Sequence, residues 1–94
     1  MTPDKARAIY LKAVRKVAPD ADLEAVRAGA DVRYVCHLDP QRFRRFVGRL
    51  SDLAGFVVHL DDADADSLRT IDDAVRFLVN ESSRLTLLGL HTAG

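Results

Sequence analysis

The side chains that could act as a nucleophile and a base are few, and Cys36 with His37 is the first pair to consider. A thiol beside an imidazole can work as a nucleophile with its base, but adjacent residues rarely point towards each other, and no third group that would orient the imidazole is evident. A lone cysteine ahead of a helix is more often a small buried hydrophobic residue. The pair therefore does not predict a thiol catalyst.

The residues that commonly bind metal ions are scattered. The three histidines, His37, His59 and His91, do not have the spacing of a zinc site, and the single cysteine adds no ligand pattern. The aspartates of residues 61–73 lack the glycine and the terminal glutamate of an EF-hand calcium loop, so we interpret Asp61 and its neighbours as a solvated acidic loop. We expect no metal ion, and we expect that the chain is not an enzyme.

Positive charge is concentrated on one segment, residues 37–55, which has the pattern of a long helix. Its apolar residues recur at the spacing of a single helix face. They are Phe43, Phe46, Val47, Leu50, Leu53 and Ala54. Asp39 is a typical N-cap, Pro40 suits the first helical position, and Gly55 suits a left-handed stop. The other face carries Arg42, Arg44, Arg45 and Arg49. We expect this helix to form the centre of the fold and to present its arginines to a partner.

Two more long helices are predicted on either side of this segment. The first begins after Thr2 with Pro3 at its first position and ends near Ala18. Its apolar stripe is Ala6, Ile9, Tyr10, Ala13, Val14 and Val17. The last begins after Thr70, a good N-cap, with Asp72 and Asp73 at its positive end. Its stripe is Ile71, Ala74, Val75, Leu78 and Val79.

The connections are expected to carry some structure. The connection at residues 19–38 is long for a loop in so small a domain, so it is predicted to carry structure of its own, with one or two helical turns at residues 22–28. Four apolar residues of that connection are expected to pack onto the core, namely Val32, Tyr34, Val35 and Leu38. Residues 56–58 read as a short extended crossing, and 67–69 as a single turn.

Length and composition predict one domain over residues 1–94, with a core at about 3–80 and a C-terminal extension at 81–94. The chain has 94 residues and a formal net charge of zero, which argues against bulk attraction to nucleic acid or membrane. The extension contains several leucines, which could prolong the last helix, fold back over the bundle or contact a partner. A single cysteine, the lack of a signal-like N-terminus and the lack of a membrane-spanning run lead us to expect a soluble, cytoplasmic protein.

The order of these elements resembles the acyl carrier protein family over about residues 3–80. Three matches carry the resemblance: Leu38-Asp39 before the central helix, Gly55-Phe56-Val57 after it, and residues 66–71, with the sequence Asp-Ser-Leu-Arg-Thr-Ile, before the last. The resemblance implies an all-α, four-helix bundle with three long helices, a short third helix and a long first loop. In that family the central helix opens with Asp-Ser-Leu, whose serine carries 4′-phosphopantetheine. Here the matching position is Pro40, which has no hydroxyl, so no prosthetic group is expected there.

The resemblance also implies what such a chain could do without the arm. Carrier proteins present an acidic central helix to basic partners, whereas Arg42, Arg44, Arg45 and Arg49 reverse that charge. We expect a protein-interaction or regulatory role near fatty-acid or polyketide biosynthesis. Its partner would be a biosynthetic enzyme or a carrier protein with an acidic surface.

Two alternatives remain open. Asp66-Ser67-Leu68 is a literal Asp-Ser-Leu, so Ser67 could carry the arm in a working carrier protein, but residues 68–94 are too few for the helices that should follow. The arginine-rich helix could instead bind nucleic acid. Against this reading, Phe43 and Phe46 belong to the core stripe and are not free to stack on bases, and the net charge is balanced.

Overall fold

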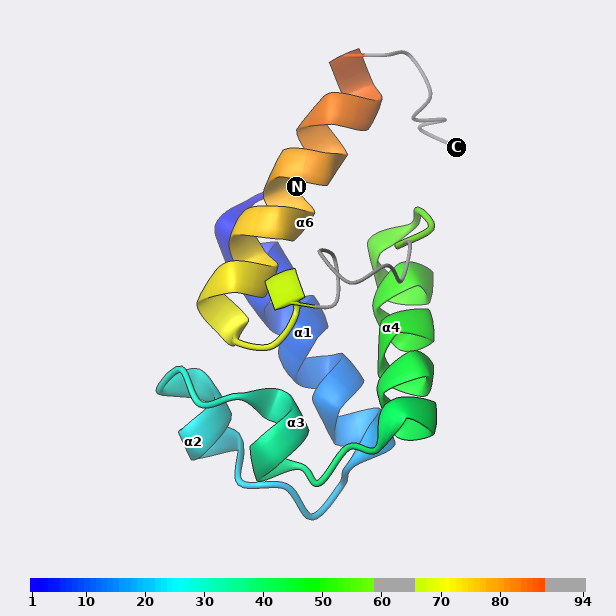
Figure 1. Ribbon diagram of the computed structural model, residues 1–94. Helices are drawn as coiled ribbons and strands as arrows, with labels where there is room; N and C mark the ends of the chain where they lie inside the picture. The colour runs from blue at the N-terminus through cyan, green and yellow to red at the C-terminus, as the bar shows by residue number, and fades with distance from the viewer. Residues whose placement is uncertain (59–65, 88–94) are drawn as a thin grey trace.

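In the computed structural model the chain folds into a set of helices, which the structure describes for residues 1–58 and 66–87 (Figure 1). The helices are α1 (Pro3–Val17), α2 (Leu23–Arg27), α3 (Val32–Val35), α4 (Pro40–Ala54) and α6 (Ile71–Leu87). Within these ranges the protein is 72% helical and has no strand. The three long helices α1, α4 and α6 form the body of the molecule, as the sequence predicted. None of the helices in this part of the chain is long and apolar enough to cross a membrane.

The bounds of α4 agree with the prediction from its capping residues. The Asp39 carboxylate accepts a hydrogen bond from the Arg42 backbone N–H at 2.7 Å, and Pro40 occupies the first helical position. The helix stops at Gly55, whose φ of 84° is left-handed and is easily reached only by glycine. Four residues of the predicted stripe are buried, namely Phe43, Phe46, Val47 and Leu50. Leu53 and Ala54, at the end of the helix, are half-buried.

The caps predicted for the other long helices are also present. The Thr2 hydroxyl accepts from the Lys5 backbone N–H at 3.2 Å, and the Thr70 hydroxyl accepts from that of Asp73 at 3.3 Å. α1 ends at Val17, within a residue of the expected end. α6 continues to Leu87, so the extension prolongs the last helix at least that far, and the remainder of 81–94 lies outside the described residues.

The first connection contains two short helices, of which only one was predicted. α2 follows its N-cap Asp22 as expected, whereas α3, capped by Asp31, was not anticipated. Val32 and Leu38 are buried, as predicted, and Val35 is partly buried against the core. The prediction for Tyr34 was wrong, since this residue is 83% exposed. Residues two apart on a helix are separated by about 200° around its axis, so burying Val32 turns Tyr34 to solvent.

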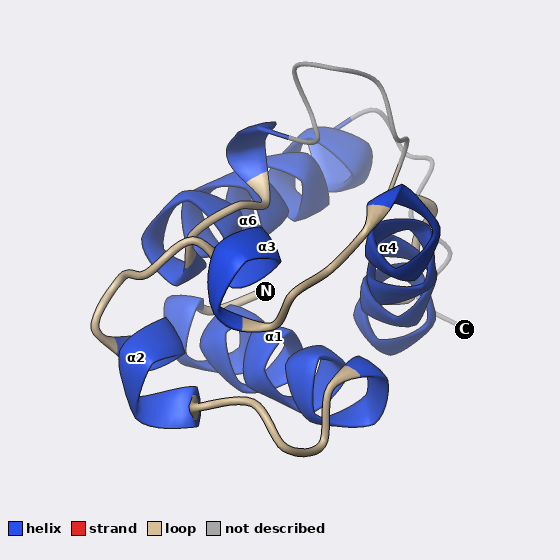
Figure 2. Cartoon of the chain, turned by 60° about the horizontal axis from the view of Figure 1, so that its bottom comes forward, coloured by secondary structure: helices blue, strands red, loops and turns tan. Residues whose placement is uncertain are grey.

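The helix at the centre of the packing is α1. It contacts both α4 and α6, whereas α4 and α6 make few direct contacts within the described ranges (Figure 2). The Tyr10 ring of α1 meets the Phe46 ring of α4 edge to face, with centroids 5.2 Å apart. The expectation that α4 would form the centre was therefore wrong. α4 provides one wall of the core, and α1 joins it to α6.

The connection after α4 is described as far as residue 58. Val58 is buried and its backbone N–H donates to the Ser51 hydroxyl at 2.9 Å, while Val57 is 70% exposed. This segment therefore returns towards the core, as the predicted crossing requires. It does not form a strand. Most of the predicted acidic loop lies outside the described residues. Asp66 and Ser67 are helical and the chain turns at 68–70 before α6, where the sequence predicted a single turn at 67–69.

Candidate partner-binding site

The start of α4 is an exposed corner of the molecule. Pro40 lies there at the first helical position, solvent-exposed, directly after the exposed N-cap Asp39. A hydroxyl at this point would be accessible to a modifying enzyme, and a phosphate attached to it would lie near the positive end of the helix dipole. Proline keeps the start of the helix and has no group to modify.

The four predicted arginines are all exposed, but they do not share one surface. Arg42, Arg45 and Arg49 line a groove of about 490 Å³, which Gly48 and Asp52 of α4 complete together with Lys16 and Val17 of α1. Arg44 is not among the groove residues, since it lies about 100° from Arg45 around the helix. The structure thus brings together three of the four predicted residues, and it adds Lys16.

The positive surface continues along α1 beyond this groove. A second hollow is lined by Lys12, Arg15, Lys16 and Pro19, and Lys16 belongs to both hollows. These three cations were not predicted as part of the site, because their relation to α4 depends on how the two helices pack. Their spacing is nevertheless that of one helix face, which was a usable signal. None of the cations lining the two hollows forms an ion pair with another described residue.

Ser67, the alternative attachment residue, lies in a different part of the molecule. It is half-buried in the turn before α6, and it lines a separate hollow with Arg76, Phe77 and Asn80. A long helix does not begin within one residue of Ser67, since α6 begins at Ile71 after its cap. The local structure therefore differs from the exposed helix start at Pro40.

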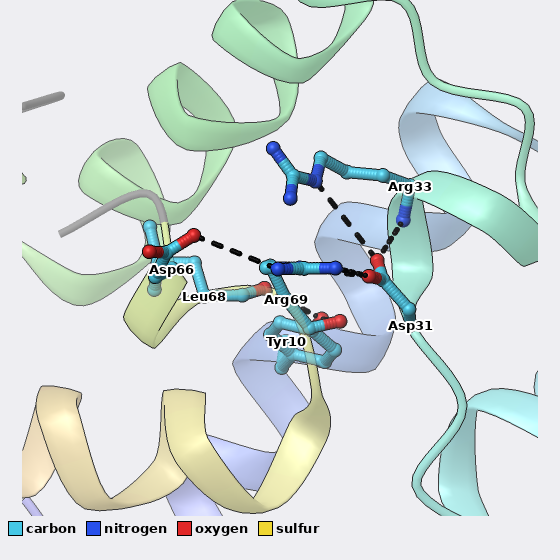
Figure 3. Close-up of polar contacts among 6 residues, drawn as sticks. All are labelled: Tyr10, Asp31, Arg33, Asp66, Leu68 and Arg69. Carbon is cyan, nitrogen blue, oxygen red and sulfur yellow. Dashed lines mark hydrogen bonds and ion pairs between the residues drawn. The ribbon is translucent and has the colours of Figure 1, made fainter. Parts of the chain in front are cut away.

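The turn that holds Ser67 is tied to α3 by a pair of charges (Figure 3). The Arg69 guanidinium lies 2.6 Å from the Asp31 carboxylate and 3.7 Å from that of Asp66. The hydrogen bond from Arg69 to Asp31, aided by its negative charge and that of Asp66, raises the pKa of the guanidinium. Arg33 also approaches Asp31, at 4.0 Å. These contacts hold the turn in place, and we assign them a structural role.

Tyr10 ties the same turn to α1 from inside the protein. Its hydroxyl donates to the Leu68 carbonyl at 2.9 Å, and Figure 3 shows the ring beneath Arg69. The Val32 backbone N–H donates to the Arg69 carbonyl at 2.7 Å. Burial, together with smaller effects of nearby negative charges, raises the pKa of the Tyr10 hydroxyl. A phenol that keeps its proton and donates to a carbonyl serves structure better than catalysis.

The remaining candidates for chemistry are not assembled into a site. Cys36 is 5% exposed and belongs to the core cluster, so the prediction of a buried hydrophobic role is confirmed. Burial raises the pKa of its thiol, which disfavours the reactive thiolate. His37 is exposed, with a positive φ of 52°. Among residues 1–58 and 66–87, no three His, Cys, Asp or Glu side chains lie close enough to hold a metal ion.

Comparison of the chain with protein-family models, with curated protein sequences and with solved structures gave no match. The basic groove between α1 and α4 is therefore judged on its own geometry. It is an open surface lined by four cations and one carboxylate.

Proposed function

We propose that this protein is a non-catalytic interaction module, shaped like an acyl carrier protein but lacking the phosphopantetheine arm. The observation that carries the proposal is the start of α4, where an exposed proline stands at the position that the resemblance assigns to the modified serine. Three long helices with a long, partly helical first connection are compatible with the four-helix carrier arrangement. The short turn at residues 66–67 would stand in for its third helix.

The partner, in this proposal, is a protein with an acidic surface, either a biosynthetic enzyme or a true carrier protein. The support is electrostatic. Arg42, Arg45 and Arg49 are exposed along one groove, and charges of this kind speed the encounter with acidic partners and reject basic ones. A regulatory or scaffolding role follows if the module competes with, or holds, charged carrier proteins.

The decisive experiment is the intact mass of the unmodified protein after incubation with coenzyme A, Mg²⁺ and a broad-specificity phosphopantetheinyl transferase. A true carrier protein in the same reaction serves as the positive control. We expect no mass gain. A gain of one phosphopantetheine that disappears in Ser67→Ala would show a working carrier protein modified at Ser67, and would overturn the proposal.

A matched variant tests the assignment of Pro40. We expect Pro40→Ser, in a background where Arg42 and Arg45 are changed to Gln, to accept the arm from the same transferase. Neutral residues are needed because basic charge beside the serine would oppose docking of a basic transferase. Failure of this variant, with its fold intact by circular dichroism, would contradict the carrier-like alignment.

Nucleic-acid binding is the weaker function for the same surface. Phe43 and Phe46 are 5% and 0% exposed, so neither ring of α4 is available for stacking on a base.

A further inference from the structure

We infer that the groove between α1 and α4 is a docking site for an acidic α-helix of a protein partner, whose backbone approaches α4 at Gly48. The inference rests on the proposed function in taking the partner to be a protein, and it adds the element that binds and the residues that hold it. Three observations support it: the charge of the groove, the spacing of its cations, and a glycine that no contact among the described residues requires.

The charge of the groove selects an acidic occupant with several carboxylates. Lys16, Arg42, Arg45 and Arg49 line it around one acidic residue, and Lys12 and Arg15 extend the positive surface along α1. All six cations are exposed and form no ion pair with another residue of the described segments. An enclosed site for a small anion would bury its ligands, whereas this surface is open and long. Such a surface suits a macromolecule that makes several contacts along it better than it suits a small anion.

The spacing of the cations along α4 favours a helix over an extended peptide. Arg42, Arg45 and Arg49 follow each other at i, i+3 and i+7, which places them about 4.5 and 6 Å apart along the helix axis. Acidic residues on one face of a second helix repeat at the same intervals. Side chains on one face of an extended strand repeat about every 6.6 to 6.8 Å and do not match the first interval.

Gly48 is the third observation, because no contact within the described part of the protein accounts for it. It lies in the middle of α4, where glycine is less favourable than alanine by about 1 kcal/mol. Its φ is not positive, and a methyl group added to it would meet nothing within 4 Å. The residue lines the groove between Arg45 and Arg49. A glycine at this point lets the backbone of an occupant come close to α4 while its carboxylates reach the flanking arginines.

Arg44 provides a matched control that the chain itself supplies. It is an exposed arginine of the same helix, one residue from Arg45, and it does not line the groove. General electrostatic attraction would depend on both arginines almost equally. Binding in the groove depends on Arg45 and leaves Arg44 dispensable.

The probe for the test is a lactam-stabilised, alanine-based helical peptide with glutamates at i, i+3 and i+7 on one face. Its binding to the full chain is followed by fluorescence anisotropy at about 50 mM salt, where screening is limited. A peptide of the same composition with its glutamates distributed around the helix is the control ligand. Single-stranded and duplex DNA of mixed sequence, and inorganic phosphate, are measured in parallel.

We expect Arg45→Glu and Arg49→Glu to weaken binding of the one-faced peptide by about tenfold or more, equivalent to about 1.4 kcal/mol. Arg44→Glu is expected to change it less than about twofold. Gly48→Leu is expected to raise the melting temperature, since leucine favours helix, and yet to reduce binding at least about tenfold by filling the groove. This opposite movement of stability and binding separates a blocked site from an unfolded protein.

Several results would overturn the inference. They are equal losses from Arg44→Glu and Arg45→Glu, unchanged binding by Gly48→Leu, equal binding of the two peptides, or tighter binding of DNA or phosphate than of the one-faced peptide. The mass experiment on the unmodified protein uses neither the peptides nor any groove variant. A failure of the proposed function is therefore distinguishable from a failure of the docking site.

Discussion

Asp31 and Arg69 lie 38 positions apart in the chain, and their side chains form a hydrogen-bonded ion pair in which the Arg69 Nε is 2.7 Å from the Asp31 carboxylate. Asp31 also accepts from the Arg33 backbone N–H at 2.9 Å and so caps α3. One carboxylate therefore both starts a helix and holds the turn that precedes another. Substitutions at Asp31 can therefore separate its contribution as an N-cap from its contribution as an ion-pair partner.

Asp31→Ser retains a capping oxygen and removes the ion pair, whereas Asp31→Ala removes both. We expect the alanine variant to lose about 1 kcal/mol of unfolding free energy more than the serine variant, which is the usual value of an N-cap. Urea denaturation at neutral pH measures the difference. Equal stability of the two variants would mean that the capping bond contributes little.

The Tyr10 hydroxyl is expected to contribute to stability through the Leu68 carbonyl. Tyr10→Phe leaves a buried carbonyl without this donor, so we expect a loss of about 1 to 2 kcal/mol in the free energy of unfolding. Tyr34→Phe is the matched control, because Tyr34 is 83% exposed and should tolerate the change. If the two variants proved equally stable, the buried hydrogen bond would make no net contribution to the free energy of unfolding.

The raised pKa of Tyr10 also predicts a loss of stability at high pH. The folded protein holds this proton to a higher pH than the unfolded chain does, whose tyrosine has the ordinary value of 10.0. The stabilising contribution is complete below about pH 10 and is lost above it, at up to about 1.4 kcal/mol per pH unit. Denaturation at several pH values should show this slope in Cys36→Ala, which removes the thiol whose pKa is also raised. The slope should be smaller after Tyr10→Phe is added, and an unchanged slope would assign the effect elsewhere.

The burial of Cys36 predicts slow alkylation. The residue is 5% exposed and the pKa of its thiol is raised, so both access to the thiol and its thiolate fraction are reduced in the native protein. Iodoacetamide at pH 8 should label native protein much more slowly than protein in concentrated urea, as mass spectrometry can follow. Equal rates in the two conditions would indicate an accessible cysteine and reopen a chemical role for it.

The long helices could be predicted from the sequence because their signals are local. Asp39, Pro40 and Gly55 each act within one turn of the chain, and the apolar stripe of α4 depends on spacing alone. α3 escaped prediction because four residues contain too little periodicity to register, and Tyr34 was consequently placed on the wrong side. The ion pair of Asp31 with Arg69 has no local signature at all.

In the candidate site, too, some features have a local sequence signal and others do not. The exposure of Arg42, Arg45 and Arg49 followed from their place opposite the apolar stripe, and their separation from Arg44 could have been read from the helical repeat. The contribution of Lys16 could not be predicted from the sequence, because it arises from the packing of α1 against α4. That packing is set by the whole core and not by any single segment.

The contact between Tyr10 and Leu68 also bears on how the protein is made. The two residues are 58 positions apart. In a nascent chain that has already formed α1, the Tyr10 hydroxyl can therefore meet its acceptor only after the intervening residues have been synthesised. Until α6 emerges from the ribosome, the apolar face of α1 lacks the part of its cover that α6 provides. Synthesis of α6 thus completes the burial of α1, and the fold can close only after residues far beyond α1 have been made.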